Sequence, residues 1–101
     1  MSIYATVTAK AAPGQMAAAM QWALEVRDWL NDNLSLDIEV LTNIGADAWT
    51  FHWVAKYDSI AQWDETYGKI FTNEDYLALV KKANEAGLIS EITSSLYRIA
   101  P

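Results

Sequence analysis

Residues 48–67 read AWTFHWVAKYDSIAQWDETY, and this stretch predicts a strand that leads directly into a helix. From residue 49 to residue 57, aromatic and β-branched side chains recur with period two, which puts two sets on opposite faces of a strand. Neither set forms a polar, solvent-exposed face before Lys56, so we expect a central strand covered on both faces. The odd set is Trp49, Phe51, Trp53, Ala55 and Tyr57, and the even set is Thr50, His52, Val54 and Lys56.

The helix that follows this strand is predicted to pack back on the sheet. Asp58 and Ser59 offer side-chain oxygens for its N-cap. Apolar residues then recur at helical spacing, so one stripe faces the sheet and Trp63 leans over it. The members of the stripe are Ile60, Trp63, Tyr67 and Ile70.

The elements before this stretch follow from the same two periods. Residues 2–10 alternate as a strand, and residues 13–32 carry apolar side chains at helical spacing. Residues 36–44 alternate again, and the Asn- and Gly-containing segment 43–47 connects them to the central strand as a hairpin.

The elements after this stretch complete the pattern. Residues 72–75, Thr-Asn-Glu-Asp, resemble a capping box that restarts a second helical segment near Thr72, and Gly87 fits its stop position. Residues 88–99 form the last strand, whose polar middle at residues 93–95 can hold a bulge.

The order βαββαβ predicts an α+β, ferredoxin-like fold in a single domain of residues 1–101, with a four-stranded antiparallel sheet and helices on one face. No predicted helix covers the other face of the sheet. The central strand has no polar set of side chains that could face water there. We therefore expect a homodimer that pairs two such sheets face to face.

Composition narrows the class of partner. The net charge is −6, and the seven Lys and Arg residues are scattered, which argues against nucleic acid and anionic membranes. There is no cysteine, so disulfides, thiol chemistry and zinc–thiolate sites are excluded. No signal peptide or spanning segment is recognisable, and we expect a soluble cytoplasmic protein.

The element order, residues 53–63 and the Asp75-Tyr76 helix leading to Gly87-Leu88 resemble the dimeric α/β-barrel superfamily. That group includes antibiotic-biosynthesis-type monooxygenases, haem-degrading monooxygenases and NIPSNAP-type proteins. The resemblance implies a dimeric α/β barrel and matches Trp63 to a helix tryptophan that haem-degrading members place against their ligand. Those members carry a haem-ligating histidine where this chain has Asn73, so we expect neither haem nor another cofactor.

The predicted ligand-binding residues are Trp63, His52, Tyr67 and Thr50, in a pocket between sheet and helices. His52 is the single histidine and the one side chain that titrates near neutral pH when unperturbed, which makes it the candidate catalytic base. Asp37 and Glu39 alternate on one strand face and could approach His52, but they specify a metal site poorly. We expect no metal.

Three functions are compatible with these residues, and the sequence does not decide whether the protein is an enzyme. The first is binding of a small apolar or aromatic molecule between sheet and helices. The second is a cofactor-independent monooxygenase that acts on a quinol or polyketide-like substrate. The third is a protein-interaction module that uses Trp22 and Trp29, which share one flank of the first helix.

Overall fold

The computed structural model describes residues 2–100 of the chain. The predicted element order is confirmed, with the second helical segment divided into two helices at Thr72 and Asn73. The elements are β1 (Ile3–Ala11), α1 (Met16–Leu34), β2 (Glu39–Thr42), β3 (Thr50–Tyr57), α2 (Ile60–Phe71), α3 (Glu74–Ala86) and β4 (Ile89–Arg98).

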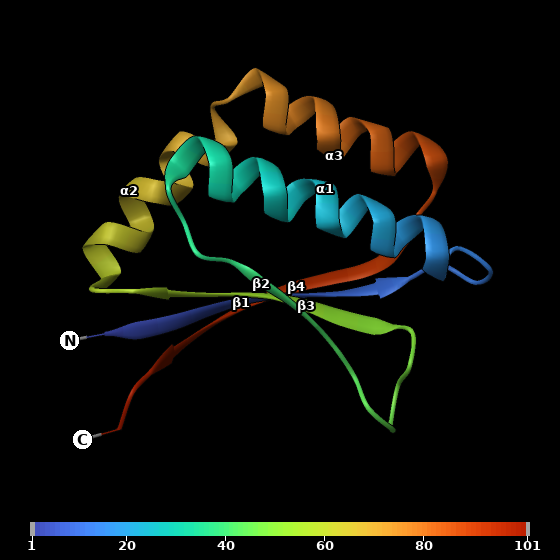
Figure 1. Ribbon diagram of the computed structural model, residues 1–101, viewed down its shortest axis with the longest axis horizontal. Helices are drawn as coiled ribbons and strands as arrows, with labels where there is room; N and C mark the ends of the chain where they lie inside the picture. The colour runs from blue at the N-terminus through green and yellow to red at the C-terminus, as the bar shows by residue number, and fades with distance from the viewer. Residues whose placement is uncertain (1, 101) are drawn as a thin grey trace.

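The four strands form one antiparallel sheet in the order β2-β3-β1-β4 (Figure 1). β1 lies between β3 and β4, with Val7 opposite Trp53 on one side and opposite Ser94 on the other. All three helices lie on one side of the sheet, and α1 and α3 run beside each other above it (Figure 1). This is the ferredoxin-like α+β fold that the sequence predicts.

The core lies between the sheet and the helices. The odd-numbered residues of β3 face the helices, and Phe51, at 0% exposure, is the most deeply buried large side chain. Ala19 and Ala23 of α1 are also fully buried, which lets the helix backbone approach the sheet closely. The alternation in residues 49–57 therefore separates a core-facing set from a set that faces away.

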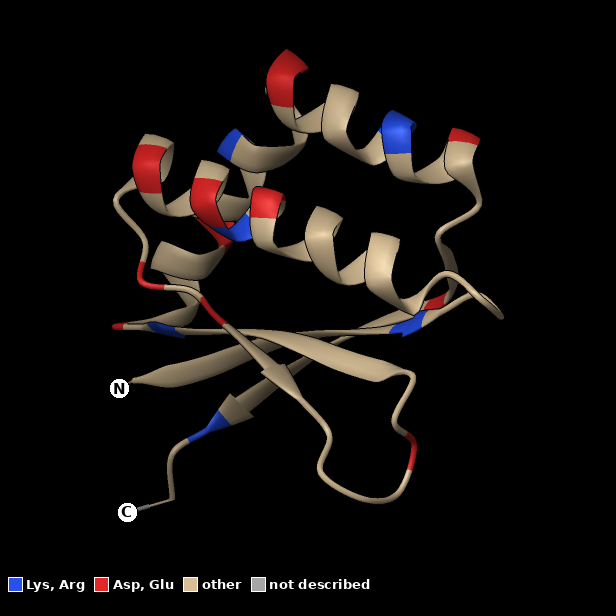
Figure 2. Ribbon diagram, turned by 45° about the vertical axis from the view of Figure 1, so that its right-hand side comes forward, with Lys and Arg blue, Asp and Glu red and all other residues tan. Residues whose placement is uncertain are grey.

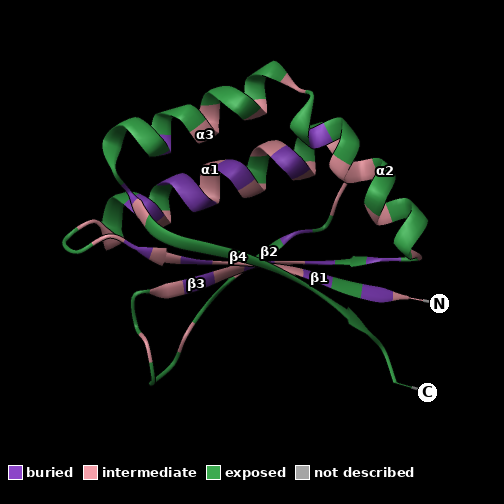
Figure 3. Cartoon of the chain, turned by 180° about the vertical axis from the view of Figure 1, so that it is seen from behind, coloured by how far each residue is buried: buried purple, intermediate pink, exposed green. Residues whose placement is uncertain are grey.

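The opposite face of the sheet has no cover within the chain. It carries the even-numbered residues of β1 and β3, where Thr8 lies opposite His52 and Thr6 lies opposite Val54. Beyond Ile89, every residue of β4 is exposed (Figure 3). Charged residues lie mainly on the helices and at the ends of strands, which leaves the middle of this face nearly uncharged (Figure 2).

Side-chain caps define the limits of α2 and α3. The Ser59 hydroxyl accepts a hydrogen bond from the Gln62 backbone N–H, as expected of an N-cap. The predicted capping box at Thr72 is wrong by one residue, because Asn73 caps α3 and accepts from the backbone N–H groups of Asp75 and Tyr76. Gly87 ends α3 in the left-handed conformation, with φ of 62°.

Two strands differ from their predicted form. β2 is shorter than residues 36–44, because the Asn31 side chain bonds the backbone N–H and C=O of Ile38 before pairing with β3 begins. The bulge in β4 lies at Ser90 and not at residues 93–95: the register shifts there, and the Ser90 hydroxyl donates to the Lys10 carbonyl at 3.2 Å.

α1 covers Met16–Leu34, in place of the predicted residues 13–32, because Gly14, with φ of 77°, turns the chain before the helix begins. None of the helices within residues 2–100 is long and apolar enough to cross a membrane.

Candidate functional site

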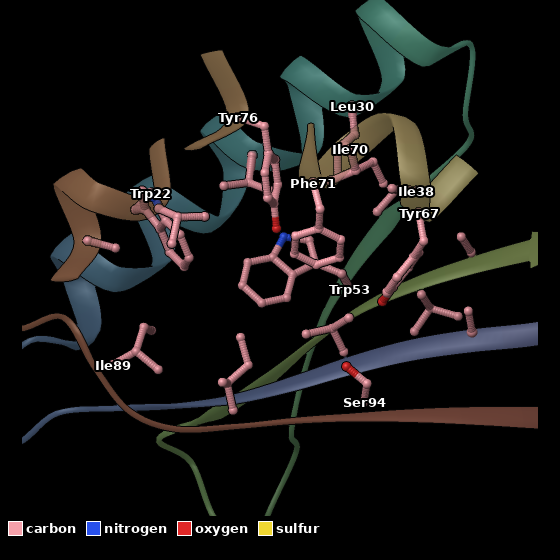
Figure 4. Close-up of a pocket in the computed structure, with 18 of the residues that line it drawn as sticks. Trp22, Leu30, Ile38, Trp53, Tyr67, Ile70, Phe71, Tyr76, Ile89 and Ser94 are labelled. Carbon is pink, nitrogen blue, oxygen red and sulfur yellow. The ribbon is translucent and has the colours of Figure 1, made fainter. Parts of the chain in front are cut away.

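A cavity of about 420 Å³ lies between the sheet and the helices (Figure 4). Its walls come from β1, β3 and β4 below and from all three helices above. Phe71 and Ile92, each more than half exposed, mark the side on which it opens. Six aromatic residues line it: Trp22, Trp53, Tyr57, Tyr67, Phe71 and Tyr76.

Two tryptophans form a rigid inner wall. The Trp53 indole N–H donates to the Ala23 carbonyl at 3.0 Å, and the Trp22 indole N–H donates to the Leu79 carbonyl at 2.9 Å. The two rings meet edge to face, with centroids 5.6 Å apart. Because both polar atoms are satisfied by the backbone, the rings present apolar surface to the cavity in fixed orientations.

Aromatic side chains from α2 and α3 form the opposite wall. Tyr67 and Phe71 of α2 line the cavity with ring centroids 5.3 Å apart, and Trp63 packs on Tyr67 at 4.6 Å without lining the cavity. Tyr76 of α3 continues this wall at 5.7 Å from Phe71 and lies 6.0 Å from Trp29. The break between α2 and α3 thus brings aromatic residues from two helices into one wall.

Three hydroxyl groups from three elements point into the cavity: Tyr67 from α2, Tyr76 from α3 and Ser94 from β4 (Figure 4). None of them makes a hydrogen bond to another residue within the described part of the chain. Burial raises the pKa of Tyr76 above its usual value, with a further contribution from Tyr67. The three hydroxyls can therefore donate hydrogen bonds to an acceptor atom of a ligand.

The four predicted site residues are divided between the two faces of the sheet. Tyr67 lines the cavity, and the half-buried Trp63 packs on the Tyr67 ring. The Trp63 indole nitrogen is buried and has no hydrogen-bond partner among residues 2–100. His52 and Thr50, as even-numbered residues of β3, lie on the uncovered face. Their roles in ligand binding remain predictions, but one pocket cannot contain all four.

His52 is held by its neighbours on the uncovered face. Asn43 Nδ2 donates to the Asp47 carbonyl at 2.9 Å, so its Oδ1 accepts from His52 Nε2–H at 2.8 Å. The Thr8 hydroxyl lies 2.8 Å from the other ring nitrogen, Nδ1. Thr50, the other predicted site residue on this face, donates a side-chain hydrogen bond to Asp47. This bond is the main reason why the pKa of the Asp47 carboxyl lies below its usual value. With both ring nitrogens engaged, His52 links β1 and β3 to the 43–49 loop.

No group of three or more potential metal ligands occurs within residues 2–100. Glu39 lies opposite Val54 and Leu41 lies opposite His52, so Glu39 is a diagonal neighbour of the histidine. Asp37 precedes β2.

Trp22 and Trp29 do not form an exposed ridge. The hypothesis of a protein-interaction module that uses these two residues is therefore wrong. Trp22 is only 7% exposed, and Trp29 is half-buried against Tyr76. The reason is that α3 packs along α1 and supplies both the Leu79 carbonyl and the Tyr76 ring as partners.

Sequence reasoning missed most of the cavity wall, namely Trp22, Trp53, Phe71, Tyr76 and Ser94. A usable signal was present, because Trp53 belongs to the more apolar set of the central strand. That set faces the helices, and any cavity between sheet and helices has to be lined by it.

No protein-family model matches the chain, and no curated protein matches its sequence. Solved structures match over almost its whole length. An uncharacterised NIPSNAP domain protein from Burkholderia xenovorans superposes with a TM-score of 0.80 at 8% identity, covering 97% of this chain and 94% of that one. An antibiotic biosynthesis monooxygenase-like protein from Deinococcus radiodurans has a TM-score of 0.73 at 8% identity, covering 98% and 93%.

A third similar structure is a dimeric protein of unknown function with a ferredoxin-like fold, from Bacteroides fragilis. Its TM-score is 0.71 at 16% identity, covering 97% of this chain and 96% of that one. Identities this low establish a common architecture and carry no activity from one protein to another. The chain therefore has the ferredoxin-like α+β fold found in NIPSNAP-type and monooxygenase-like structures, as its sequence resemblance implied.

Proposed function

We propose that this protein binds a small apolar, aromatic molecule in the cavity between the sheet and the helices. The observation that carries this proposal is the cavity itself, which has about 420 Å³ of space and six aromatic residues in its walls. Pockets for small molecules typically have about 300–1,000 Å³ and combine apolar walls with a few polar groups that orient the ligand. Here the hydroxyls of Tyr67, Tyr76 and Ser94 supply those groups.

Binding is better supported than the alternative of a cofactor-independent monooxygenase acting on a quinol or polyketide-like substrate. The likeness to the Deinococcus radiodurans structure favours the alternative. That chemistry needs a base to deprotonate the substrate, however, and His52 lies on the other face of the sheet with both ring nitrogens hydrogen-bonded.

The neutral fluorescent probe N-phenyl-1-naphthylamine is expected to bind in the cavity, because its aromatic rings suit the walls. Saturable probe fluorescence, with quenching of Trp22 and Trp53 emission, measures the binding. Ser94→Phe should weaken it about tenfold or more by occupying the cavity, since lost apolar contact area lowers affinity.

Ala18→Phe is the control, because Ala18 lies on the exposed side of α1, away from both the cavity and the open face of the sheet. It should leave the affinity for the probe nearly unchanged. Equal affinities of the probe for the wild-type protein and Ser94→Phe would place the binding elsewhere and refute the proposal.

We also propose that the protein is a homodimer in which a second copy covers the open face of the sheet. Tyr4 and Tyr97 lie opposite each other on this face and are 41% and 54% exposed, and Leu41 is 45% exposed. The dimeric Bacteroides fragilis structure with the same fold supports this proposal. Stable interfaces bury at least about 1,000 Å², which a sheet of this size can supply.

Sedimentation equilibrium is expected to give the mass of a dimer at micromolar concentration. Thr6→Lys puts a charge at the centre of the open face and should shift the mass toward that of a monomer, because an unpaired charge is costly to bury. Ala18→Lys, on the exposed side of α1, adds the same charge away from the sheet and should not. A monomeric wild-type protein would contradict the dimer.

A further inference from the structure

No Lys, Arg or His among residues 2–100 lines the cavity. Glu91 borders it near the start of β4, but it is paired with Lys10 of β1, so its side chain belongs to the uncovered face of the sheet. Lys10 lies opposite Glu91 in the sheet, but its ammonium group forms an ion pair with Asp47 at 3.4 Å. The chain as a whole has a net charge of −6. The part of the chain that the structure describes therefore places no cation on the cavity wall to balance a negative charge inside it.

The pKa values of two tyrosines in the cavity wall indicate that a negative charge is unfavourable there. Burial is the main cause that raises the pKa of both Tyr57 and Tyr76 above the usual value of 10.0, and the neighbouring Tyr67 raises both further. The phenolate form is therefore disfavoured at these two positions. An anionic group on a ligand would also lose its hydration when buried between these walls, so its binding would be disfavoured for the same reason.

The cavity hydroxyls do not remove this penalty. Tyr67, Tyr76 and Ser94 donate neutral hydrogen bonds, which any acceptor oxygen of a neutral ligand can use (Figure 4). An anion gains the same hydrogen bonds, but it gives up the stronger hydration of a full charge, and no cation among the lining residues offsets that loss.

We propose that the cavity selects neutral aromatic molecules and rejects anionic ones of the same size. This proposal rests on the proposed function, because it describes the selectivity of the same site. It also bears on the oxidation hypothesis: a substrate activated as a phenolate or enolate would carry the charge that these walls disfavour.

Two probes that share one ring system test the selectivity. N-Phenyl-1-naphthylamine is neutral, and 1-anilinonaphthalene-8-sulfonate is the same molecule with an added sulfonate. The neutral probe is expected to bind at least about tenfold more tightly, measured by fluorescence titration at near-neutral pH. If the two probes bind equally, or the anion binds more tightly, the selectivity is refuted while the binding function stands. If neither binds, both proposals fail.

A pair of lysine variants separates the charge of the cavity from the charge of the whole protein. Ser94→Lys places a cation on the cavity wall, and Ala18→Lys places it on the exposed side of α1, away from both the cavity and the open face of the sheet. Both change the net charge equally. Ser94→Lys should tighten binding of the sulfonate probe by about tenfold relative to Ala18→Lys, because its ammonium group pairs with the sulfonate. Equal affinities for the sulfonate in the two variants would overturn the proposal.

Discussion

Replacing Trp53 with alanine is expected to lower the free energy of unfolding by about 3–5 kcal/mol, the usual cost of truncating a buried large aromatic side chain. Trp53 is 7% exposed, donates to the Ala23 carbonyl and meets the rings of Trp22 and Phe51 at 5.6 Å and 5.3 Å. The loss is a large share of the stability of a domain, which is about 5–15 kcal/mol. Urea denaturation followed by circular dichroism measures it.

Trp49→Ala is the matched control for this experiment. Trp49 belongs to the same alternating set in the sequence, but it lies just before β3 and is 49% exposed. Its removal should change the stability by no more than about 0.5 kcal/mol, as for other surface substitutions. A cost below about 1 kcal/mol for Trp53→Ala, the size of a typical substitution, would mean that Trp53 does not hold the sheet to α1.

The second large effect is expected at Asn31, where alanine should cost about 1–3 kcal/mol. The Asn31 side chain accepts from the Ile38 backbone N–H at 2.8 Å and donates to the Ile38 carbonyl at 3.2 Å. Ile38 is 7% exposed, so removing the amide leaves two backbone groups unsatisfied away from water. Chemical denaturation gives the cost, and faster hydrogen exchange at the Ile38 amide locates it.

Asn33→Ala controls for the removal of an amide from the same helix turn. The exposed Asn33 side chain donates only to the Trp29 carbonyl of its own helix, so its loss should cost less than about 0.5 kcal/mol. Asn31→Asp keeps the acceptor for Ile38 N–H and loses the donor, and should fall between wild type and Asn31→Ala. Equal stability of Asn31→Ala and Asn33→Ala would show that Asn31 does not anchor the start of β2.

The order of elements could be predicted because it depends on local patterns. Alternation in residues 49–57 gives the central strand, Ser59 caps α2, the segment 72–75 marks the restart at α3 with the cap one residue later than predicted, and Gly87 stops the last helix. Each of these signals acts within a few residues of the element that it defines. The length of β2 could not be predicted in this way, because it is set by Asn31, a side chain in the preceding helix.

The candidate site depended on contacts that are remote in the sequence. Alternation separates His52 from Trp53, and the more apolar character of the Trp53 set is the one sequence signal for which of them faces the helices. That is settled by the close approach of α1, whose Ala23 carbonyl lies 30 residues away from its partner Trp53. In the same way, Trp22 is covered because it finds the Leu79 carbonyl, 57 residues further along the chain. His52 attracted interest for its chemistry, and its position in the sheet is what removes it from the cavity.

The position of β1 between β3 and β4 has a consequence for biosynthesis. Of the four strands of this sheet, β1 leaves the ribosome before the others, and its neighbour β4 leaves after them, with Ile3 opposite Arg98. Until β4 emerges, the nascent chain carries β1 with one edge unpaired, and an unpaired edge is a template for association with other chains. Contacts between strands so far apart in the sequence also form slowly during folding, because the entropy of closing the long loop between them must be lost first. The sheet can therefore be completed only after β4 has emerged, and a chain interrupted before residue 89 is left with this edge open.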